Sequence, residues 1–400
     1  MRVIVQKYGG SSLAKPEFID RVAERVISTK NMGYEVVVVV SAIGETTDQL
    51  IELAKQITKN PPRRELDMLL SVGERVSIAL LAMAITERGY PAISFTGSQV
   101  GIITTTDHTR ARILEIKGNR IRKELQDGKI VIVAGYQGVS VEKEITTLGR
   151  GGSDTTAVAL AAALNAERCE IMTDVDGVYT ANPQVVPNAQ RISEITYDEM
   201  LDMADLGAQV LKASAVEFAK RHNIKIYVGS SSTGYIGTII THGKLDKQRV
   251  TGVAVDENVV LISLNHSTKQ SYFSIIKSLA EEGVATKFIG KSGKSCFFIL
   301  KDEDLETAKS IIESHKRKRA NILMSLNQDI GLLSVIGVGI NFGTDIMAKM
   351  MKIFDAMSVF PETYNFSETR LSFGIKKQHL KEVASTIHDT LIIHSNYAKV

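Results

Sequence analysis

Residues 36–42 read Val-Val-Val-Val-Val-Ser-Ala, and this stretch decides the fold class. An unbroken run of β-branched residues without polar alternation is typical of a strand buried on both faces, as strands of parallel sheets are. Ile130 to Ala134 is a second such run, and shorter strand patterns span Val3 to Gln6, Ile171 to Asp174 and Ile224 to Val228. The first part of the chain therefore predicts a sheet of several buried strands.

Helical patterns lie between these strands. Pro16 to Thr29 places its apolar residues on one face, Leu66 to Ala84 is predicted to be one long apolar helix, and Asp154 to Asn165 is rich in alanine. The alternation of strands and helices predicts an α/β fold with a mainly parallel sheet, covered by helices on both faces.

The region after about residue 250 contains an internal duplication. Phe298 corresponds to Phe373 and Leu305 to Leu380, at a constant offset of 75 residues. Each copy reads strand-helix-strand-strand-helix-strand, which predicts two small ferredoxin-like domains. We expect a first domain at residues 1–241, a linker at 242–249, and the two copies at 250–326 and 327–400.

The composition excludes several classes of protein. The 400 residues include 48 Lys or Arg and 45 Asp or Glu, a net charge of +3. Such a balance gives no strong field for nucleic acid or an anionic membrane. The two cysteines, Cys169 and Cys296, are too few for a disulfide framework or a cysteine metal cluster. No apolar run reaches the ~18 residues of a membrane span. We expect a cytoplasmic protein without nucleic-acid or membrane partners.

The first candidate site is Lys7-Tyr8-Gly9-Gly10-Ser11-Ser12, between a strand and a helix. Paired glycines let backbone N–H groups approach a phosphate, and a lysine at the strand end can neutralise a transferring phosphoryl group. The spacing is not that of a P-loop, and no GxGxxG motif occurs. A purely structural turn remains the alternative.

The second candidate is the loop from Gly149 to Asp154, directly before the alanine-rich helix. Ser153 or Asp154 could simply cap that helix. A cap does not require three glycines and an arginine beside it, so we favour a functional loop. Arg150 offers a planar fork that suits a carboxylate or a phosphate.

Two further segments are candidates. Thr173 to Pro183 follows a strand, and loops at the carboxyl ends of strands are where α/β sheets bind ligands, although its aspartates could serve only as turn formers. Glu74 lies in a strongly apolar helix, and a buried glutamate needs a partner. That partner is either Arg75 or another cation of the chain, or a substrate ammonium group.

Together these segments resemble one known family. Lys7 to Ser12, Ser41-Ala42, Ser71 to Glu74, Gly149 to Ala157 and Thr173 to Pro183 follow the order and spacing of the aspartate kinases, members of the amino-acid kinase superfamily. The resemblance covers nearly the whole chain, and the two C-terminal copies resemble the paired ACT domains of that family.

The resemblance implies ATP- and Mg²⁺-dependent phosphorylation of L-aspartate to 4-phospho-L-aspartate, the first step toward lysine, threonine, methionine and diaminopimelate. We assign no residue of the chain as a metal ligand. The reacting carboxylate is ionised near pH 7, so no general base is required. The implied residues are, for catalysis, Lys7 and Asp154; for aspartate, Ser41, Thr47, Glu74, Tyr136, Arg150 and Ser153; for nucleotide, Lys7, Tyr8, Gly9, Gly10, Gly151, Gly152, Thr173, Asp174, Tyr179, Asn182 and Pro183.

The chain departs from the family at two places. Gln209 stands where the family usually has a lysine that approaches ATP phosphates, and Lys212 is the candidate replacement. Ala285 to Lys291 lacks residues that often occur in the effector pocket of the first copy, so the second copy is the better candidate for binding lysine, threonine or diaminopimelate. Pairing of these copies across chains implies a homodimer or higher homo-oligomer.

Two other functions stay open at this stage. One is a kinase of the same superfamily that acts on glutamate, N-acetylglutamate, carbamate or UMP. The other is an amino-acid-sensing regulatory protein without catalytic activity, which the substitution at Gln209 favours and the intact Lys7, Arg150 and Asp154 oppose.

Overall fold

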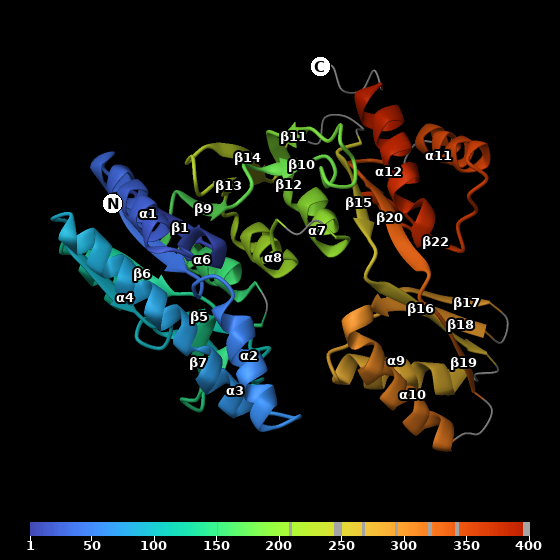
Figure 1. The fold of residues 1–400 in the computed structure, drawn as a ribbon, viewed down its shortest axis with the longest axis horizontal. Helices are drawn as coiled ribbons and strands as arrows, with labels where there is room; N and C mark the ends of the chain where they lie inside the picture. Colours follow the sequence, from blue (N-terminus) through green and yellow to red (C-terminus); the bar gives the residue numbers. More distant parts are fainter. Residues whose placement is uncertain are drawn as a thin grey trace. The chain divides into compact units, whose positions relative to one another are not determined.

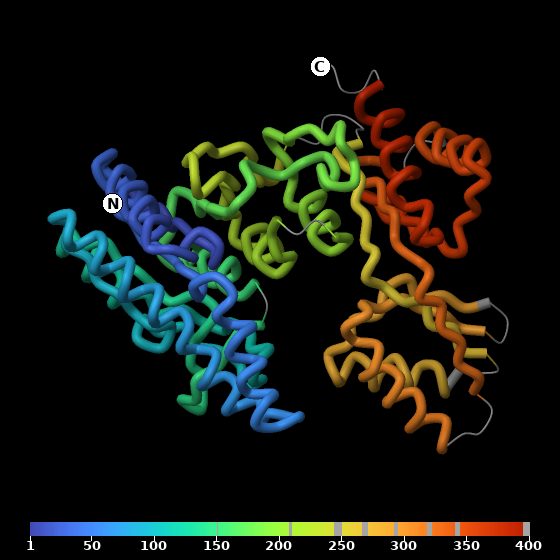
Figure 2. Tube along the Cα trace, viewed as in Figure 1, coloured from blue at the N-terminus to red at the C-terminus, as the bar shows by residue number. Residues whose placement is uncertain are grey.

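The computed structural model forms two compact units (Figures 1 and 2). It describes residues 1–149, 151–207, 210–243, 250–265, 269–292, 295–318, 322–340 and 344–394. The first unit comprises Met1–Val178, Arg191–Asp205 and Gln209–Lys244, and the second comprises Tyr179–Gln190, Leu206–Ala208 and Leu245–Val400.

The first unit is built on an eight-stranded sheet in the order β12-β14-β13-β9-β1-β2-β6-β3. Neighbouring strands are parallel except β13 and β14, so the predicted mainly parallel sheet is confirmed. The strands are β1 Val3–Tyr8, β2 Glu35–Val40, β3 Ala92–Phe95, β6 Ile130–Ala134, β9 Arg168–Thr173, β12 Glu194–Thr196, β13 Ile226–Ser230 and β14 Ile236–Thr241.

Helices cover both faces of this sheet, as the valine run predicts. Val36, Val38 and Val40 pack with α1 and α4 in one hydrophobic core. Val37 and Val39 are also fully buried, and alternation along a strand turns them to the opposite face, where α5 and α6 contact the sheet. The helices are α1 Pro16–Asn31, α2 Thr46–Ile57, α3 Arg63–Leu70, α4 Val72–Glu87, α5 Asn119–Gln126, α6 Gly152–Leu164, α7 Tyr197–Asp205 and α8 Ala213–His222.

Two smaller sheets are formed by the remaining strands before residue 200. One has the order β5-β4-β7-β8, and the other pairs β10 with β11. The chain between β10 and β11 belongs to the second unit. Their strands are β4 Ile102–Thr104, β5 Ile113–Ile116, β7 Gln137–Ser140, β8 Ile145–Thr147, β10 Val178–Tyr179 and β11 Arg191–Ile192.

The single helix expected from Leu66 to Ala84 is wrong in one respect, because the helix is broken at Ser71. The amide side chain of Gln137 donates a hydrogen bond of 2.9 Å to the carbonyl of Ser71 and so holds the break. By length and composition alone, the combined stretch Arg63–Glu87 is long and apolar enough to cross a membrane. Core helices of globular domains meet the same criterion, and α4 packs on the sheet.

The second unit contains two four-stranded antiparallel sheets with two helices each. The first copy runs continuously as strand-helix-strand-strand-helix-strand and forms the sheet β17-β18-β16-β19. Its elements are β16 Val259–Asn265, α9 Lys269–Glu281, β17 Lys287–Ser292, β18 Ser295–Lys301, α10 Leu305–Lys318 and β19 Leu323–Asn327.

The second copy takes its fourth strand from before the first copy. Its sheet has the order β15-β20-β22-β21, so β15 pairs with β20 and not with β16. The strand at 252–256 therefore does not belong to the first copy, although the boundary expected at residue 250 implied that it did. β20 is buried along its whole length and needs a neighbouring strand on each side. A local sequence pattern does not reveal which strand that neighbour is. The elements are β15 Gly252–Asp256, β20 Ile330–Ile336, α11 Thr344–Ala356, β21 Thr363–Phe366, β22 Arg370–Lys376 and α12 Leu380–His388.

A segment from the first 241 residues also belongs to the second unit. Ala181 and Val186 pack in the hydrophobic core of the second copy. The hydroxyl of Thr180 lies 2.8 Å from Nε2 of the fully buried His388, at the end of α12. Burial lowers the pKa of His388, and neighbouring Asp389 opposes this effect in part. Residues 179–190 are thus anchored to the C-terminal copies.

Candidate functional site

Four adjacent parallel strands end at the same edge of the large sheet. The loops that follow β1, β2, β6 and β9 begin at Gly9, Ser41, Gly135 and Asp174. The carboxyl ends of parallel strands are where open α/β sheets bind ligands. The sheet order therefore brings together the segments that the sequence singled out separately.

An ion pair lies at the centre of this edge. Lys7 is the penultimate residue of β1, and its Nζ lies 2.7 Å from Oδ1 of Asp154 in the first turn of α6. Both side chains are largely buried, with 12% and 9% of their surface exposed. The two atoms attract by charge, although their geometry does not make a well-aligned hydrogen bond. A carboxylate so placed fixes the position of the lysine's charge.

The glycine pair after β1 permits a close approach of backbone segments. A Cβ atom at Gly9 would lie 3.5 Å from Nζ of Lys7, and one at Gly10 would lie 2.7 Å from the carbonyl oxygens of Ala42 and Gly44. The backbone N–H of Gly44 donates to the carbonyl of Gly10 at 3.0 Å. Any larger residue at position 10 would push the loop after β2 away.

Glu74 is a buried carboxylate with one oxygen available. Its Oε1 accepts a hydrogen bond of 3.2 Å from the backbone N–H of Ala42, and its Oε2 has no hydrogen-bond partner among the described residues. Burial raises the pKa of Glu74 to about 7, although backbone N–H groups that donate to the carboxylate lower it in part. The expected alternative partner, Arg75, is exposed and forms no such pair with it in the described part of the chain.

The glycine loop before α6 packs against the loop after β6. A Cβ atom at Gly135 would lie 2.6 Å from Oγ of Ser153, and one at Gly152 would lie 3.1 Å from the ring of Tyr136. Tyr136 has a positive φ of 67°, and its backbone N–H donates to Oγ1 of Thr156 at 3.2 Å. Ser153 and Tyr136, both predicted to contact aspartate, are therefore neighbours in the fold.

Lys212 crosses the same glycine loop. Gly151 has φ of 76°, and a Cβ atom there would lie 1.8 Å from Cγ of Lys212. Lys212 is the residue that precedes α8, and the hydroxyls of Ser214 and Thr155 lie 3.0 Å apart, which joins the starts of α8 and α6. Its ammonium group is exposed and has no partner in the described residues.

The remaining predicted residues are placed as follows. Ser41 and Thr47 are half-buried, in the loop after β2 and in the first turn of α2. Thr173 ends β9, and its hydroxyl donates to Asp174 at 2.9 Å. Arg150 and Gln209 lie outside the described residues. The three expected nucleotide residues in the segment anchored to the second unit are Tyr179, Asn182 and Pro183.

Tyr8, which was predicted to contact the nucleotide, has its side chain in the interior. Its side chain is fully buried, and its hydroxyl lies 3.4 Å from Oε1 of Gln6 in the interior. Burial raises the pKa of Tyr8, so the phenol stays neutral. The physical reason is strand alternation, which turns neighbouring side chains of β1 to opposite faces. A nucleotide at this edge would therefore meet only the backbone of Tyr8.

The sequence did not predict the contacts of two polar groups. The backbone N–H of Ala42 contacts Glu74, and buried Asp67 contacts His108 and Thr147. No short-range pattern reveals the first group. The second carried a signal, because Asp67 is an acidic residue inside a predicted apolar helix.

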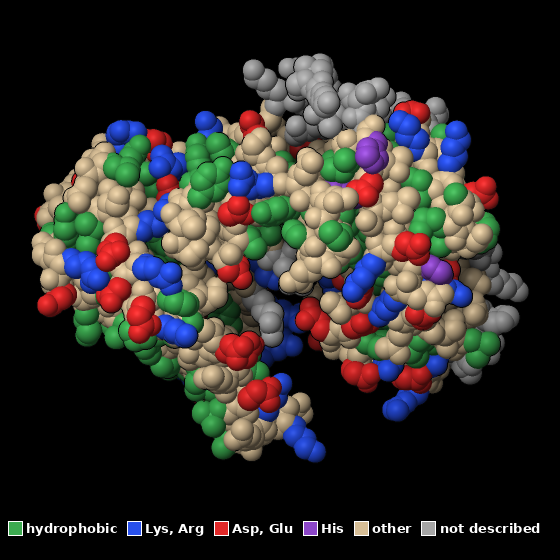
Figure 3. Space-filling view, turned by 45° about the horizontal axis from the view of Figure 1, so that its top comes forward, with side chains coloured by type: hydrophobic (Ala, Val, Ile, Leu, Met, Phe, Trp, Pro, Cys, Tyr) green, Lys and Arg blue, Asp and Glu red, His purple; other side chains and the backbone are tan. Residues whose placement is uncertain are grey.

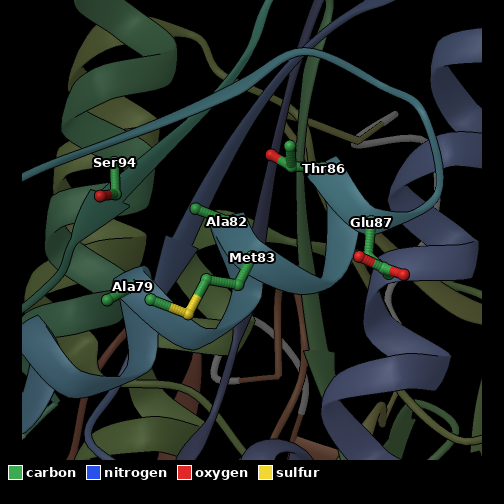
Figure 4. Close-up of a pocket in the computed structure, with 6 residues that line it drawn as sticks. All are labelled: Ala79, Ala82, Met83, Thr86, Glu87 and Ser94. Atoms are coloured by element: carbon green, nitrogen blue, oxygen red, sulfur yellow. The ribbon is translucent and has the colours of Figure 1, made fainter.

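A cavity of about 470 Å³ lies away from this edge, between α4 and the edge strand β3. Figure 4 shows that α4 supplies all of its lining residues except Ser94. No titratable cluster lines it, so it is not our candidate site. On the face drawn in Figure 3, Lys and Arg side chains are interspersed with Asp and Glu, in agreement with the balanced composition.

Comparisons with known proteins show the family of the chain. Residues 2–230 match the model of the amino acid kinase family. Over the full length, the chain is 42% identical to an aspartokinase of Bacillus sp. (strain MGA3), covering 100% of this chain and 99% of that one. The chain belongs to the aspartokinase family.

Other members of the family support this assignment. An aspartokinase of Corynebacterium glutamicum is 41% identical over 97% of this chain and 96% of its own. The structure of E. coli aspartokinase III with aspartate and ADP, in the R-state, matches with a TM-score of 0.85 at 25% identity, covering 98% of this chain and all of that one. The same enzyme with lysine and aspartate, in the T-state, matches with a TM-score of 0.77, covering 97% and 99%.

Proposed function

We propose that this aspartokinase-family chain transfers the γ-phosphoryl group of ATP to the side-chain carboxylate of L-aspartate and forms 4-phospho-L-aspartate. The observation that carries the proposal is the Lys7–Asp154 pair beside the glycines that follow β1. It supplies a fixed positive charge at a sheet edge suited to phosphate, in a chain that is 42% identical to an aspartokinase over its whole length.

Catalysis in this site consists of positioning and charge neutralisation. The attacking carboxylate is already ionised near pH 7, since its reference pKa is about 4. Lys7 neutralises charge on the phosphoryl group during transfer, while Asp154 holds its ammonium in place. Backbone N–H groups near Gly9 and Gly10 add donors that need no reorganisation.

Two residues distinguish the ends of the amino-acid substrate. Glu74 offers an acceptor oxygen in a buried setting, which suits the α-ammonium group of aspartate. Arg150 offers a bidentate fork, which suits the α-carboxylate. Holding both groups at the α-carbon leaves the side-chain carboxylate free to react. Ser41, Thr47, Tyr136 and Ser153 complete this proposed pocket.

The nucleotide side combines the glycine loop with cations. Lys212 lies across Gly151 with an exposed ammonium. Thr173 ends the neighbouring β9, and Asp174 follows it. Mg²⁺ would accompany ATP and screen the charge of its phosphates. No group of three or more acidic, His or Cys side chains that could hold a metal ion occurs in the described residues. A site without such a group fits a Mg²⁺ ion that is held mainly by the phosphate oxygens of ATP, together with one or two protein carboxylates.

The proposal is tested by trapping the product with hydroxylamine. Purified enzyme with ATP, Mg²⁺ and L-aspartate should form aspartyl hydroxamate, and omission of any component should abolish it. Parallel reactions with glutamate, N-acetylglutamate, carbamate and UMP test the other superfamily substrates. Activity with one of these alone would overturn the substrate assignment, and inactivity with all would favour a non-catalytic sensor.

We also propose that the two ferredoxin-like copies bind an amino-acid end product. The T-state structure of E. coli aspartokinase III contains lysine, which supports lysine as the first candidate. The second copy connects to the kinase part through residues 179–190, which pack against α12. An effector that shifts α12 would therefore move residues 179–190 and, through them, the loop that begins at Asp174. Titration calorimetry of the whole chain with lysine, threonine and diaminopimelate tests this proposal.

We propose that the chain assembles as a homo-oligomer, with a second copy of the chain on α4. The outward face of α4 exposes Val76, Leu80 and Met83, and β3 is an edge strand beside it. Arg75 near one end of α4 and Glu87 at the other would meet in an antiparallel pair of these helices, so the face is complementary to itself in charge. Light scattering of the wild type and Met83→Glu tests this interface. An unchanged mass for the variant would exclude it.

A further inference from the structure

Asp67 is a buried carboxylate that the proposed site does not use. It lies in α3 and is fully buried. Its Oδ2 lies 2.7 Å from Nδ1 of His108, and its Oδ1 accepts a 2.5 Å hydrogen bond from the hydroxyl of Thr147. The backbone N–H of Thr109 donates to both oxygens at 3.1 Å. A buried charge is unfavourable without partners, so Asp67 needs the donors that surround it. Through them this one side chain fixes two separate segments, residues 108–109 and the end of β8.

One of these segments is held in a strained conformation. Thr109 has φ of 69°, in the left-handed region that β-branched residues rarely adopt. Such strain persists only where the surroundings enforce it, and it is concentrated at functional sites. Here the enforcing group is Asp67, which binds the N–H of Thr109 and the ring of His108.

The strained turn lies against the glycine loop. Gly149 has φ of 76°, and a Cβ atom there would lie 3.2 Å from the carbonyl oxygen of Thr109. Thr147, which Asp67 also binds, ends β8 two residues before Gly149. On the other side, the backbone N–H of Gly152 donates to the carbonyl of Gly149 at 3.0 Å, and Lys212 covers Gly151. The two residues that flank Arg150 in the chain are thus both fixed.

We propose that Asp67 is a positioning residue that sets Gly149 and the described part of the glycine loop for binding the α-carboxylate of aspartate. The inference rests on the role proposed for Arg150. It assigns the polar network around α3 to substrate binding, beyond any contribution to stability, because Asp67 holds a strained turn against the loop.

The test compares Asp67→Asn with the wild type in steady-state kinetics. Asparagine keeps the size, but its NH₂ group replaces one of the two acceptor oxygens that three donors now share. A loop displaced by about 1 Å costs up to roughly a hundredfold, so the KM for aspartate should rise roughly ten- to a hundredfold while the KM for ATP stays within about twofold. Thr147→Val, which removes one donor and keeps the shape, should change the aspartate KM in the same direction by less.

Controls separate positioning from folding. Glu65→Gln is the matched variant on α3, because Glu65 is exposed and pairs only with neighbouring Arg64 in the described residues. It should change neither KM. In the Arg150→Ala background, Asp67→Asn should add less than about twofold to the aspartate KM, because residues that act through one contact are not additive.

Three results would overturn the inference. They are an unchanged aspartate KM in Asp67→Asn, equal changes in both KM values, and an undiminished effect in the Arg150→Ala background. Calorimetric titration of the same proteins with aspartate gives the affinity directly, so the inference is tested even if the wild type lacks turnover. Absence of wild-type turnover would refute the proposed function and leave the affinity comparison valid.

Discussion

Replacing Lys212 with alanine should weaken ATP binding and leave aspartate binding nearly unchanged. The stem of Lys212 lies across Gly151, so its ammonium is held at the glycine loop before any ligand arrives. Gln209, where the family usually has a lysine, cannot supply that charge. Lys212 is therefore the cation available from this part of the chain to contact the phosphates.

The size of the effect follows from the exposure of the group. A hydrogen bond to a charged partner contributes about 1.5–3 kcal/mol, and screening by water at an exposed ammonium reduces this to about 1–2 kcal/mol. Since about 1.4 kcal/mol is a factor of ten, the KM for ATP should rise roughly five- to thirtyfold. Lys212→Arg should retain most of the affinity, because it keeps the charge and the stem.

The assay is steady-state kinetics with ATP and aspartate varied in turn, supported by the inhibition constant of ADP. Lys220→Ala is the matched control, because Lys220 lies on the same α8 and pairs with Asp198. Gly151→Ala should act like Lys212→Ala, since its Cβ would occupy the space of the lysine stem. An unchanged ATP KM in Lys212→Ala would refute the reasoning and show that Lys212 is only a solvated surface residue.

Further variants test the other roles. Lys7→Ala and Asp154→Ala should lower kcat on the order of a hundredfold, because a contact to developing charge is worth about 3 kcal/mol. Arg150→Ala should instead mainly raise the KM for aspartate. Similar small effects on KM in all three variants would contradict this division of roles. The aspartate KM should fall as the pH rises through about 7, where Glu74 ionises, and pH profiles of Glu74→Gln should lose that dependence. Because the folded-state pKa of Glu74 lies above its ordinary 4.5, thermal melts should show wild-type stability declining as the pH rises from 4.5 through 7, a decline that Glu74→Gln should lack. Thr180→Val removes the hydroxyl contact to α12 and should preserve effector binding in calorimetry while reducing inhibition several-fold; full inhibition would argue against this route.

Local patterns were sufficient to predict most of the fold. The buried run Val36–Val40 became a central strand because five β-branched residues in succession fit only a strand covered on both sides. The duplication at an offset of 75 residues also predicted corresponding strands correctly, since β18 and β22 occupy equivalent places. The first signal lies within the strand itself, and the second comes from comparing two segments of the same chain.

The remaining features depend on partners far away in the chain. The strand at 252–256 was expected in the first copy, but its neighbour is β20, and pairing between distant strands leaves no mark in either segment. Asp67 finds its partners about 40 and 80 residues further along. The burial of the Tyr8 side chain could have been predicted, because alternation along β1 turns it away from the side of Lys7.

The measurement that tests the central claim most directly identifies which carboxylate receives the phosphoryl group. L-aspartate labelled with ¹³C at C4 is incubated with enzyme, ATP and Mg²⁺, and the product is trapped with hydroxylamine and examined by NMR. Fixation of the α-ammonium and α-carboxylate by Glu74 and Arg150 predicts that the hydroxamate forms at C4 alone. A hydroxamate at C1, or no product with aspartate beside ready turnover of glutamate or N-acetylglutamate, would contradict the account.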